Sequence, residues 1–453
     1  MPMGLSDYLN TLTAQMRCKK ARSLVAEEIS AHILDQKEAF MAGGMDEDAA
    51  LKESIRQMGD PVTVGMEMDR IHRPRPDWKF LIFIAVFSVI GLFLQYEMNQ
   101  LSIDYTYVDY FPRHCVYTVV GLIVMAVLYF LDYTIVGKYA LRFWGLLTVY
   151  FLWAGLFAPL RNGSHGYIQL TLYLYVPVFA GLLYRYRMQG WRGLCKCLLL
   201  FVFTALLGIR CTGLYNVTAF LSLTILIMIT AAVHRGWFGV PIKRTIGLLW
   251  AAVCLAPILF ICLGGLAAYQ YDRLMAMISM FSGRGDTTFN YVAHAAQELL
   301  SAAKPLGNSG SSIAERLPYI FTDYIFTYVV SCYGYLAGAA VVLALLGGVA
   351  RIFRLSSRLT NELGWMISFG CGCVFGIETL HYILTNFGIL IFAQTYLPFF
   401  SYGLRASILT YSFSGLLLSI YRYKDVVGEV RKFPEFKTKV RVKVKLEVEK
   451  EEE

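Results

Sequence analysis

Apolar stretches close to the length that crosses a lipid bilayer follow one another from residue 80 to residue 421. A helix needs about 20 mostly apolar residues to span the hydrocarbon core, and only short polar breaks separate most of these stretches. They lie at about 80–96, 114–131, 140–159, 167–184, 194–210, 214–233, 245–268, 320–350, 361–391 and 403–421. The sequence therefore predicts an all-α polytopic membrane protein with about ten transmembrane helices, the ninth of them breaking near Asn386 and Gly388.

Composition and the placement of charged residues and cysteines argue against a soluble protein, a nucleic-acid-binding protein and a disulfide-stabilised one. The chain is 57% hydrophobic and 16% charged, whereas about a quarter of the residues of a soluble protein are charged. The net charge of +9 would suggest a nucleic-acid partner, but the basic residues flank the apolar stretches, where Lys and Arg set membrane orientation. The ten cysteines lie mostly in apolar runs, which is not a disulfide framework. Their C-x-C spacings are not those of zinc sites, so we expect no metal centre.

Loop charges predict the orientation. Alternate span ends carry most of the basic residues, namely Arg70, Arg73, Arg75, Lys79, Lys138, Arg142, Arg185, Arg187, Arg192, Lys196, Arg235, Lys243, Arg244, Arg351, Arg354, Arg358, Arg422 and Lys424. Such ends face the cytoplasm. We therefore expect a multi-pass protein of the bacterial cell membrane with both termini cytoplasmic, a large external loop at 269–319, and no cleavable signal peptide.

The segments outside the membrane domain 80–425 divide into three parts. Residues 1–70 predict a small cytoplasmic unit of three helices, the last of which is closed by Gly59-Asp60-Pro61. Residues 71–79 form a basic linker stiffened by Pro74 and Pro76. The charged tail 426–453 predicts either a solvated cytoplasmic segment or an edge strand that pairs with a partner.

The N-terminal unit resembles the short helical domain that precedes many bacterial permease-like membrane proteins. The resemblance rests on Glu27-Glu28-Ile29 with His32-Ile33, on Gly44-Met45 with Glu47 and Ala49, and on Gly59-Asp60-Pro61. It implies a regulatory or docking module.

Few ionisable residues lie inside the predicted spans. Glu378 and His381 lie one helical turn apart in the ninth span, either as a proton relay or as a satisfied pair facing the bundle interior. Asp323 lies at the start of the eighth span, where desolvation disfavours the charged carboxylate and suits it to act as a general base. The alternative is a helix cap formed by Thr322 or Asp323.

Three motifs are similar to those of the SEDS family, the shape, elongation, division and sporulation proteins. The first is the eighth-span motif, which comprises Pro318, Thr322, Asp323, Tyr324, Ile325 and Phe326 and is followed by Gly334 and Gly338. The second is Leu397-Pro398-Phe399-Phe400-Ser401-Tyr402-Gly403, preceded by Gly388. The third is Phe111-x-Arg113 with Gly121 and then Asp132-Tyr133, and Gly307-Asn308 lies where the family has an external turn.

The resemblance implies a peptidoglycan glycosyltransferase that polymerises lipid II, with undecaprenyl diphosphate as the leaving group and a class B penicillin-binding protein as partner. Asp323 would be the catalytic base that takes the proton of the acceptor hydroxyl. Arg284, Lys304 and Arg316 would offset the charge of the leaving diphosphate; the alternative for each is solvated surface charge. Arg113, Ser401 and Tyr402 would contact the substrate. A divalent cation would assist at the diphosphate, although no ligand cluster identifies one and no cofactor is indicated.

The chain departs from the family pattern at several polar positions. Tyr319 and Phe321 replace Glu and His before Thr-Asp, and Ser331 and Cys332 replace a Glu pair. Val176, Phe179 and Leu182 fall where the fourth span has Gln, Glu and Lys, and Leu404 replaces the second glycine after Ser-Tyr-Gly. Two alternatives to an active polymerase follow: a non-catalytic relative that acts as scaffold or regulator of a penicillin-binding protein, and a lipid II flippase.

Overall fold

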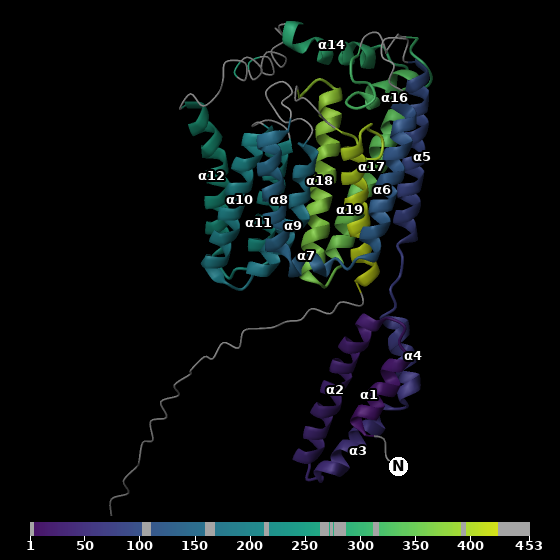
Figure 1. Ribbon diagram of the computed structural model, residues 1–453, viewed down its shortest axis with the longest axis vertical. Helices are drawn as coiled ribbons and strands as arrows, with labels where there is room; N and C mark the ends of the chain where they lie inside the picture. Colours follow the sequence, from purple (N-terminus) through teal and green to yellow (C-terminus); the bar gives the residue numbers. More distant parts are fainter. Residues whose placement is uncertain are drawn as a thin grey trace, which may run out of the picture.

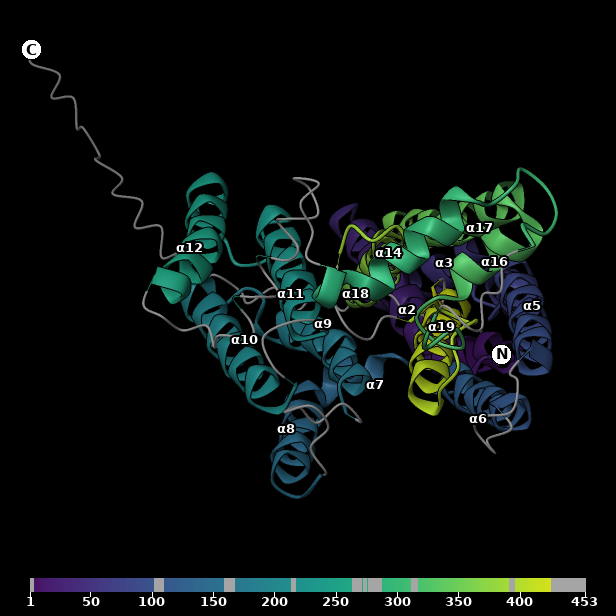
Figure 2. The same cartoon turned by 90° about the horizontal axis from the view of Figure 1, so that it is seen from above.

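The computed structural model describes residues 4–101, 110–158, 168–212, 217–262, 271, 275, 287–310, 317–390 and 396–424. Within these ranges the chain is helical and contains no strand. Figure 1 shows a small helical unit at one end of a large helical bundle, and Figure 2 shows the bundle from above. The all-α fold predicted from the apolar stretches is confirmed.

The N-terminal unit contains four helices rather than the three that the sequence predicted. They are α1 (Leu5–Ala14), α2 (Lys19–Ala42), α3 (Glu47–Met58) and α4 (Pro61–Ile71). The fourth was missed because Gly59-Asp60-Pro61 ends one helix and starts the next. The Asp60 carboxylate accepts a hydrogen bond from the Thr63 amide at 2.9 Å, and Pro61 occupies the first helical position, which tolerates a missing N–H group.

Contacts made by Tyr423 and Asp77 connect this unit and its linker to the bundle. Tyr423, at the end of α19 (Leu404–Tyr423), packs against the apolar core of the unit around Tyr8 and Leu12. The linker is anchored at its other end by Asp77, whose buried carboxylate lies 2.5 Å from the Arg351 guanidinium. Asp77 also accepts a hydrogen bond from the Phe80 amide, so the linker is held where the first membrane helix begins.

The bundle helices correspond in order to the predicted spans. They are α5 (Trp78–Leu101), α6 (Tyr110–Phe130), α8 (Ala140–Phe157), α9 (Tyr175–Tyr186), α10 (Gly190–Thr212), α11 (Val217–His234), α12 (Ile242–Cys262), α17 (Tyr335–Ser357), α18 (Glu362–Asn386) and α19. Among the described residues, seven helices are both long and apolar enough to cross a membrane: α5, α6, α8, α10, α11, α17 and α18. A short helix, α7 (Thr134–Lys138), lies between α6 and α8, and a 3-10 turn, η1 (Leu170–Leu174), leads into α9. The chain is therefore a polytopic membrane protein.

The eighth predicted span, 320–350, is not one helix. It divides into α16 (Ile325–Tyr333) and α17 at Gly334, whose φ of +93° is readily available only to glycine. A Cβ atom at Gly334 would also lie 2.6 Å from the Pro305 carbonyl oxygen. The apolar run from 320 to 350 hid this break, and Asp323 consequently lies in a turn before a short helix rather than at the start of a membrane span.

The described part of the predicted external loop contains α14 (Thr287–Ser301). This helix lies across the end of the bundle opposite the N-terminal unit (Figure 1) and packs against α16 and α18. Ala296, Leu299 and Leu300 form its buried face. The remainder of the predicted loop is largely outside the described residues, as is the predicted tail 426–453.

Glycines let α6 and α19 approach closely, as small residues do in membrane bundles. A Cβ atom at Gly415 would lie 2.6 Å from the Met125 carbonyl oxygen. We expect Gly415→Ala to destabilise the protein by about 1–3 kcal/mol, because backbone must move to make room. Gly145→Ala on α8 is the matched control, since nothing lies within 4 Å of its added Cβ atom. Thermal unfolding in detergent measures both; equal melting temperatures for the two variants would contradict the prediction.

Candidate functional site

The turn 317–324, which contains Asp323, precedes α16 at the end of the bundle where α14 lies. Tyr319 adopts a left-handed conformation with φ of +60°. Its carbonyl accepts hydrogen bonds from the amides of Thr322 at 3.0 Å and Asp323 at 2.9 Å. These two bonds close a tight turn, and Asp323 is its last residue before the N-cap of α16.

Side chains and backbone from other elements hold the carbonyls of this turn. The Phe321 carbonyl accepts hydrogen bonds from the Gln95 side-chain amide of α5 at 3.0 Å and from the Tyr402 backbone amide at 2.9 Å. The Thr322 carbonyl accepts one from the Ser401 hydroxyl at 2.8 Å. Gln95 also donates to the Phe400 carbonyl at 2.8 Å. The predicted site residues Ser401 and Tyr402 therefore lie directly against the turn that contains Asp323.

Two residues of α18 fix the junction between the turn and α16. The Tyr382 hydroxyl donates to the Thr322 carbonyl at 3.2 Å and accepts from the Ile325 amide at 2.9 Å. The Asn386 amide nitrogen donates to the Asp323 carbonyl at 2.9 Å, and its oxygen accepts from the Thr327 amide at 3.1 Å. Every carbonyl from Phe321 to Asp323 is thus satisfied by a group outside the turn.

The capping alternative for Thr322 and Asp323 is wrong. The N-cap of α16 is Tyr324, which makes no side-chain capping bond. The first amides of α16 are instead satisfied by Tyr382 and Asn386, which lie four residues apart on one face of α18. The capping function therefore lies in a neighbouring helix, which sequence proximity could not indicate.

The Asp323 side chain is partly exposed at the end of the bundle. Its carboxylate interacts electrostatically with Tyr382 and Tyr324. Burial raises the pKa of Tyr324 to about 12, and the Asp323 carboxylate adds to this rise. The Asp323 side chain is partly exposed, and Asn386 holds the Asp323 backbone carbonyl in place. The carboxylate can therefore accept a proton from a bound hydroxyl.

Arg113 of α6 reaches this site through Tyr402. The Tyr402 hydroxyl interacts by hydrogen bonds with Tyr117 and with the Arg113 guanidinium. Burial and the Tyr117 bond raise the pKa of Tyr402 to about 12, and Arg113 opposes that rise.

Phe321, which replaces the family's histidine, packs in an aromatic cluster. The Tyr110 ring stacks on it with ring centroids 4.3 Å apart.

Of the three cations predicted for the leaving group, Lys304 lies among the described residues. Lys304 is exposed, and its carbonyl accepts a hydrogen bond from the Tyr335 amide at 3.0 Å. Arg284 and Arg316 lie outside the described residues. Across the described ranges, no group of three or more His, Cys, Asp or Glu side chains is placed to hold a metal ion.

The pair Glu378 and His381 lies inside the bundle. His381 Nδ1 is 3.9 Å from Glu378 Oε2, and both side chains are 2% exposed. The Tyr173 hydroxyl of η1 donates to the other carboxylate oxygen, and the Phe220 ring lies over His381. Both residues therefore face the bundle interior, as either interpretation of the pair requires, and their contacts with Tyr173 and Phe220 join α18 to η1 and α11.

Sequence reasoning did not find Gln95, Tyr382 or Asn386. Their common signal is a polar side chain within or at the end of an apolar span, which is costly in a membrane unless it is paired. Each pairs with backbone of the 317–324 turn or α16.

Three replaced family positions, Val176, Phe179 and Leu182, are fully buried in the apolar core of the bundle.

The fold of this helical membrane protein is similar to that of two solved structures. A peptidoglycan synthase complex studied for the coordination of polymerisation and crosslinking contains a chain that is 16% identical, with a TM-score of 0.62 over 77% of this chain and 99% of that one. The rod shape determining protein RodA of Thermus thermophilus is 15% identical, with a TM-score of 0.53 over 77% and 97%. At these identities the likeness concerns the fold.

The sequence model of the FtsW, RodA and SpoVE family of cell cycle proteins matches residues 77–426. The chain belongs to this family, which confirms the resemblance found in its motifs. A probable peptidoglycan glycosyltransferase FtsW of Nitrosomonas europaea is 27% identical over 193 residues, 40% of this chain and 47% of that protein. The chain thus spans about half the length of the curated relatives it matches.

Proposed function

We propose that the protein is a peptidoglycan glycosyltransferase that polymerises lipid II. Asp323 takes the proton from the acceptor sugar hydroxyl as its oxygen bonds to the donor sugar carbon. The donor's bond to the diphosphate oxygen breaks, and undecaprenyl diphosphate leaves with that electron pair. The observation that supports this most is the fixed turn 317–324, which presents the one carboxylate of the family motif on a rigid backbone.

The proposed site needs positive charge near the departing diphosphate. Arg113 is linked to the site through Tyr402 and is a described arginine that could supply this charge. Lys304, Arg284 and Arg316 remain predicted contributors. The need for a divalent cation also remains a prediction, and omission of Mg²⁺ from the polymerisation assay tests it.

A non-catalytic scaffold or regulator is the competing function. It is favoured by the apolar side chains at positions where the family has polar ones, because Val176, Phe179 and Leu182 are packed in the core rather than available to a substrate. Under either function we propose a class B penicillin-binding protein as the partner.

We place both termini in the cytoplasm and the 317–324 turn outside. The N-terminal unit and α14 lie at opposite ends of the bundle (Figure 1), and Arg351 at the end nearer the unit pairs with Asp77. Protease that cleaves the 71–79 linker in intact cells, where only external segments are accessible, would contradict this orientation.

Purified protein mixed with lipid II, alone and with a class B penicillin-binding protein, tests the proposed activity. We expect glycan chains on a gel with at least one partner and none without the protein. If no partner supports glycan formation while the protein still binds that partner, the enzyme proposal fails and the scaffold function stands.

A further inference from the structure

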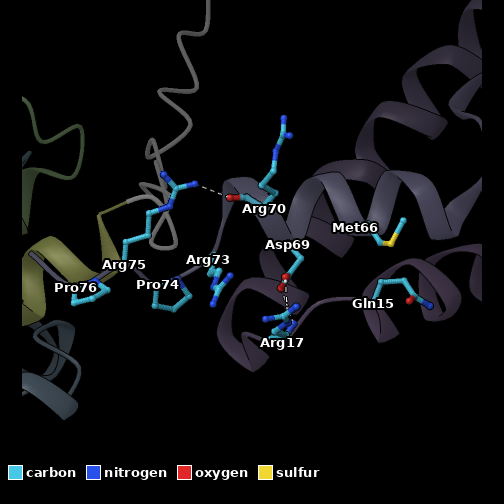
Figure 3. Close-up of a pocket in the computed structure, with 9 residues that line it drawn as sticks. All are labelled: Gln15, Arg17, Met66, Asp69, Arg70, Arg73, Pro74, Arg75 and Pro76. Atoms are coloured by element: carbon cyan, nitrogen blue, oxygen red, sulfur yellow. Dashed lines mark hydrogen bonds and ion pairs between the residues drawn. The ribbon is translucent and has the colours of Figure 1, made fainter.

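A cavity of about 680 Å³ lies where the N-terminal unit meets the linker (Figure 3). Arg17 from the end of the α1 region, Arg70 from α4, and Arg73 and Arg75 from the linker line it, together with a single carboxylate, Asp69. The net charge of these side chains is +3. The cavity therefore has the charge and the size for an anionic group.

The Asp69 carboxylate is engaged within the protein. It accepts a hydrogen bond from the Arg17 backbone amide at 2.8 Å, and Arg17 Nε lies 3.6 Å from its other oxygen (Figure 3). Its side chain is 13% exposed, against 73% for Arg17. Arg70, Arg73 and Arg75 form no ion pair with a carboxylate anywhere in the described part of the chain. No carboxylate of the described residues therefore neutralises their positive charge.

The linker holds its two arginines in a restricted backbone. Arg73 and Arg75 each precede a proline, which confines the preceding residue to extended conformations and fixes φ of the proline itself. Arg75 also donates to the Arg70 carbonyl at 3.1 Å, which ties the linker back to α4. At its far end the linker is anchored by Asp77 and Arg351. Less conformational entropy is consequently lost when these guanidinium groups bind a ligand.

The cavity lies next to the membrane surface. The linker continues directly into Trp78, the first residue of α5, whose side chain is exposed. Exposed tryptophans at span ends are typical of the headgroup region. Guanidinium groups match the oxygens of a phosphate in a forked geometry, and basic clusters beside a membrane helix attract anionic lipids.

We propose that this cavity binds a phosphate group, carried either by the headgroup of an anionic phospholipid or by a soluble phosphate compound. The bound phosphate would contact both the N-terminal unit and the linker, and it would fix the orientation of the unit relative to the bundle. The inference rests on the cavity and its charges and does not depend on the proposed glycosyltransferase activity.

Two probes applied to the purified full chain in neutral detergent distinguish the two sources. Native mass spectrometry compares retention of dioleoyl phosphatidylglycerol with that of dioleoyl phosphatidylcholine. Thermal unfolding is measured with inorganic phosphate against chloride at equal ionic strength. The test variants are Arg73→Gln, which changes one exposed side chain, and the triple variant Arg70→Gln, Arg73→Gln, Arg75→Gln. The matched control Lys138→Gln, Arg354→Gln, Arg358→Gln removes the same charge from exposed residues outside the cavity.

We expect the protein to retain the anionic lipid in preference to phosphatidylcholine. The triple variant should reduce this retention about tenfold or more, and Arg73→Gln should reduce it to a smaller extent. The control should reduce it by less than about twofold. Stabilisation by inorganic phosphate that is lost in the triple variant, without a lipid preference, would assign the site to a soluble phosphate compound. Equal loss in the triple variant and the control would overturn the proposal, since bulk charge alone would then explain the binding. An unchanged triple variant would overturn it as well.

Discussion

Replacing Asp323 by asparagine is expected to reduce glycan polymerisation by about 10²–10⁴-fold, because the amide cannot accept the proton of the acceptor hydroxyl. The fold should persist, since the hydrogen bond that joins residue 323 to Asn386 involves the backbone carbonyl and not the carboxylate. The rate of lipid II consumption by the purified protein with its partner is the measurement. The melting temperature of the variant should stay close to that of the wild type.

Glu298→Gln is the matched control for this prediction. Glu298 is an exposed carboxylate on α14, at the same end of the bundle, and its replacement removes the same charge. We expect this variant to polymerise at the wild-type rate. A fully active Asp323→Asn variant would show that Asp323 is not the base, and equal losses in both variants would point to a general electrostatic effect instead.

Replacing Asn386 by leucine is expected to destabilise the protein by about 2–4 kcal/mol and to impair the site. The Asn386 side chain is fully buried and makes four hydrogen bonds: to the carbonyls of Asp323 and Tyr382, and with the amide and hydroxyl of Thr327. Leucine leaves several of these groups buried without partners, at about 1–3 kcal/mol each in soluble proteins and less in membrane proteins. Thermal unfolding and polymerisation rate measure the two effects.

The adjacent residue supplies the control for Asn386. Thr385 is also buried, and its hydroxyl has no hydrogen-bond partner among the described residues. Thr385→Val should therefore leave stability unchanged or raise it slightly. Asn386→Asp is informative too, since it keeps an acceptor for Thr327 but loses the donor to the Asp323 carbonyl. A melting temperature for Asn386→Leu equal to that of Thr385→Val would refute the assigned role of Asn386.

The membrane helices and their order were predictable because a bilayer imposes length and apolarity on every span. The division at Gly334 was not, because α16 is as apolar as α17 and only the backbone conformation distinguishes the two. Similarly, α4 was missed because Gly59-Asp60-Pro61 was interpreted only as the end of the preceding helix. Asp60 and Pro61 also start the next one.

The site was predictable only in part. Motifs identified Asp323, Ser401 and Tyr402, and the structure places the last two against the turn that contains the first. Gln95, Tyr382 and Asn386 act on backbone carbonyls and amides far away in sequence. Such contacts depend on tertiary packing, and a sequence pattern records side-chain types rather than the backbone groups that they reach.

Helix α18 ends at Asn386 and begins at Glu362, whose carboxylate lies 2.5 Å from the Arg187 guanidinium at the opposite end of the bundle. Its 25 residues form a rod about 37 Å long, and Tyr173 donates to Glu378 in the half of the helix nearer Asn386. Most of this helix is buried, and it packs against α9, α11 and α17 along the bundle. The two side chains that hold the backbone of Asp323 are therefore carried by a buried helix whose other end is fixed by an ion pair at the far end of the bundle.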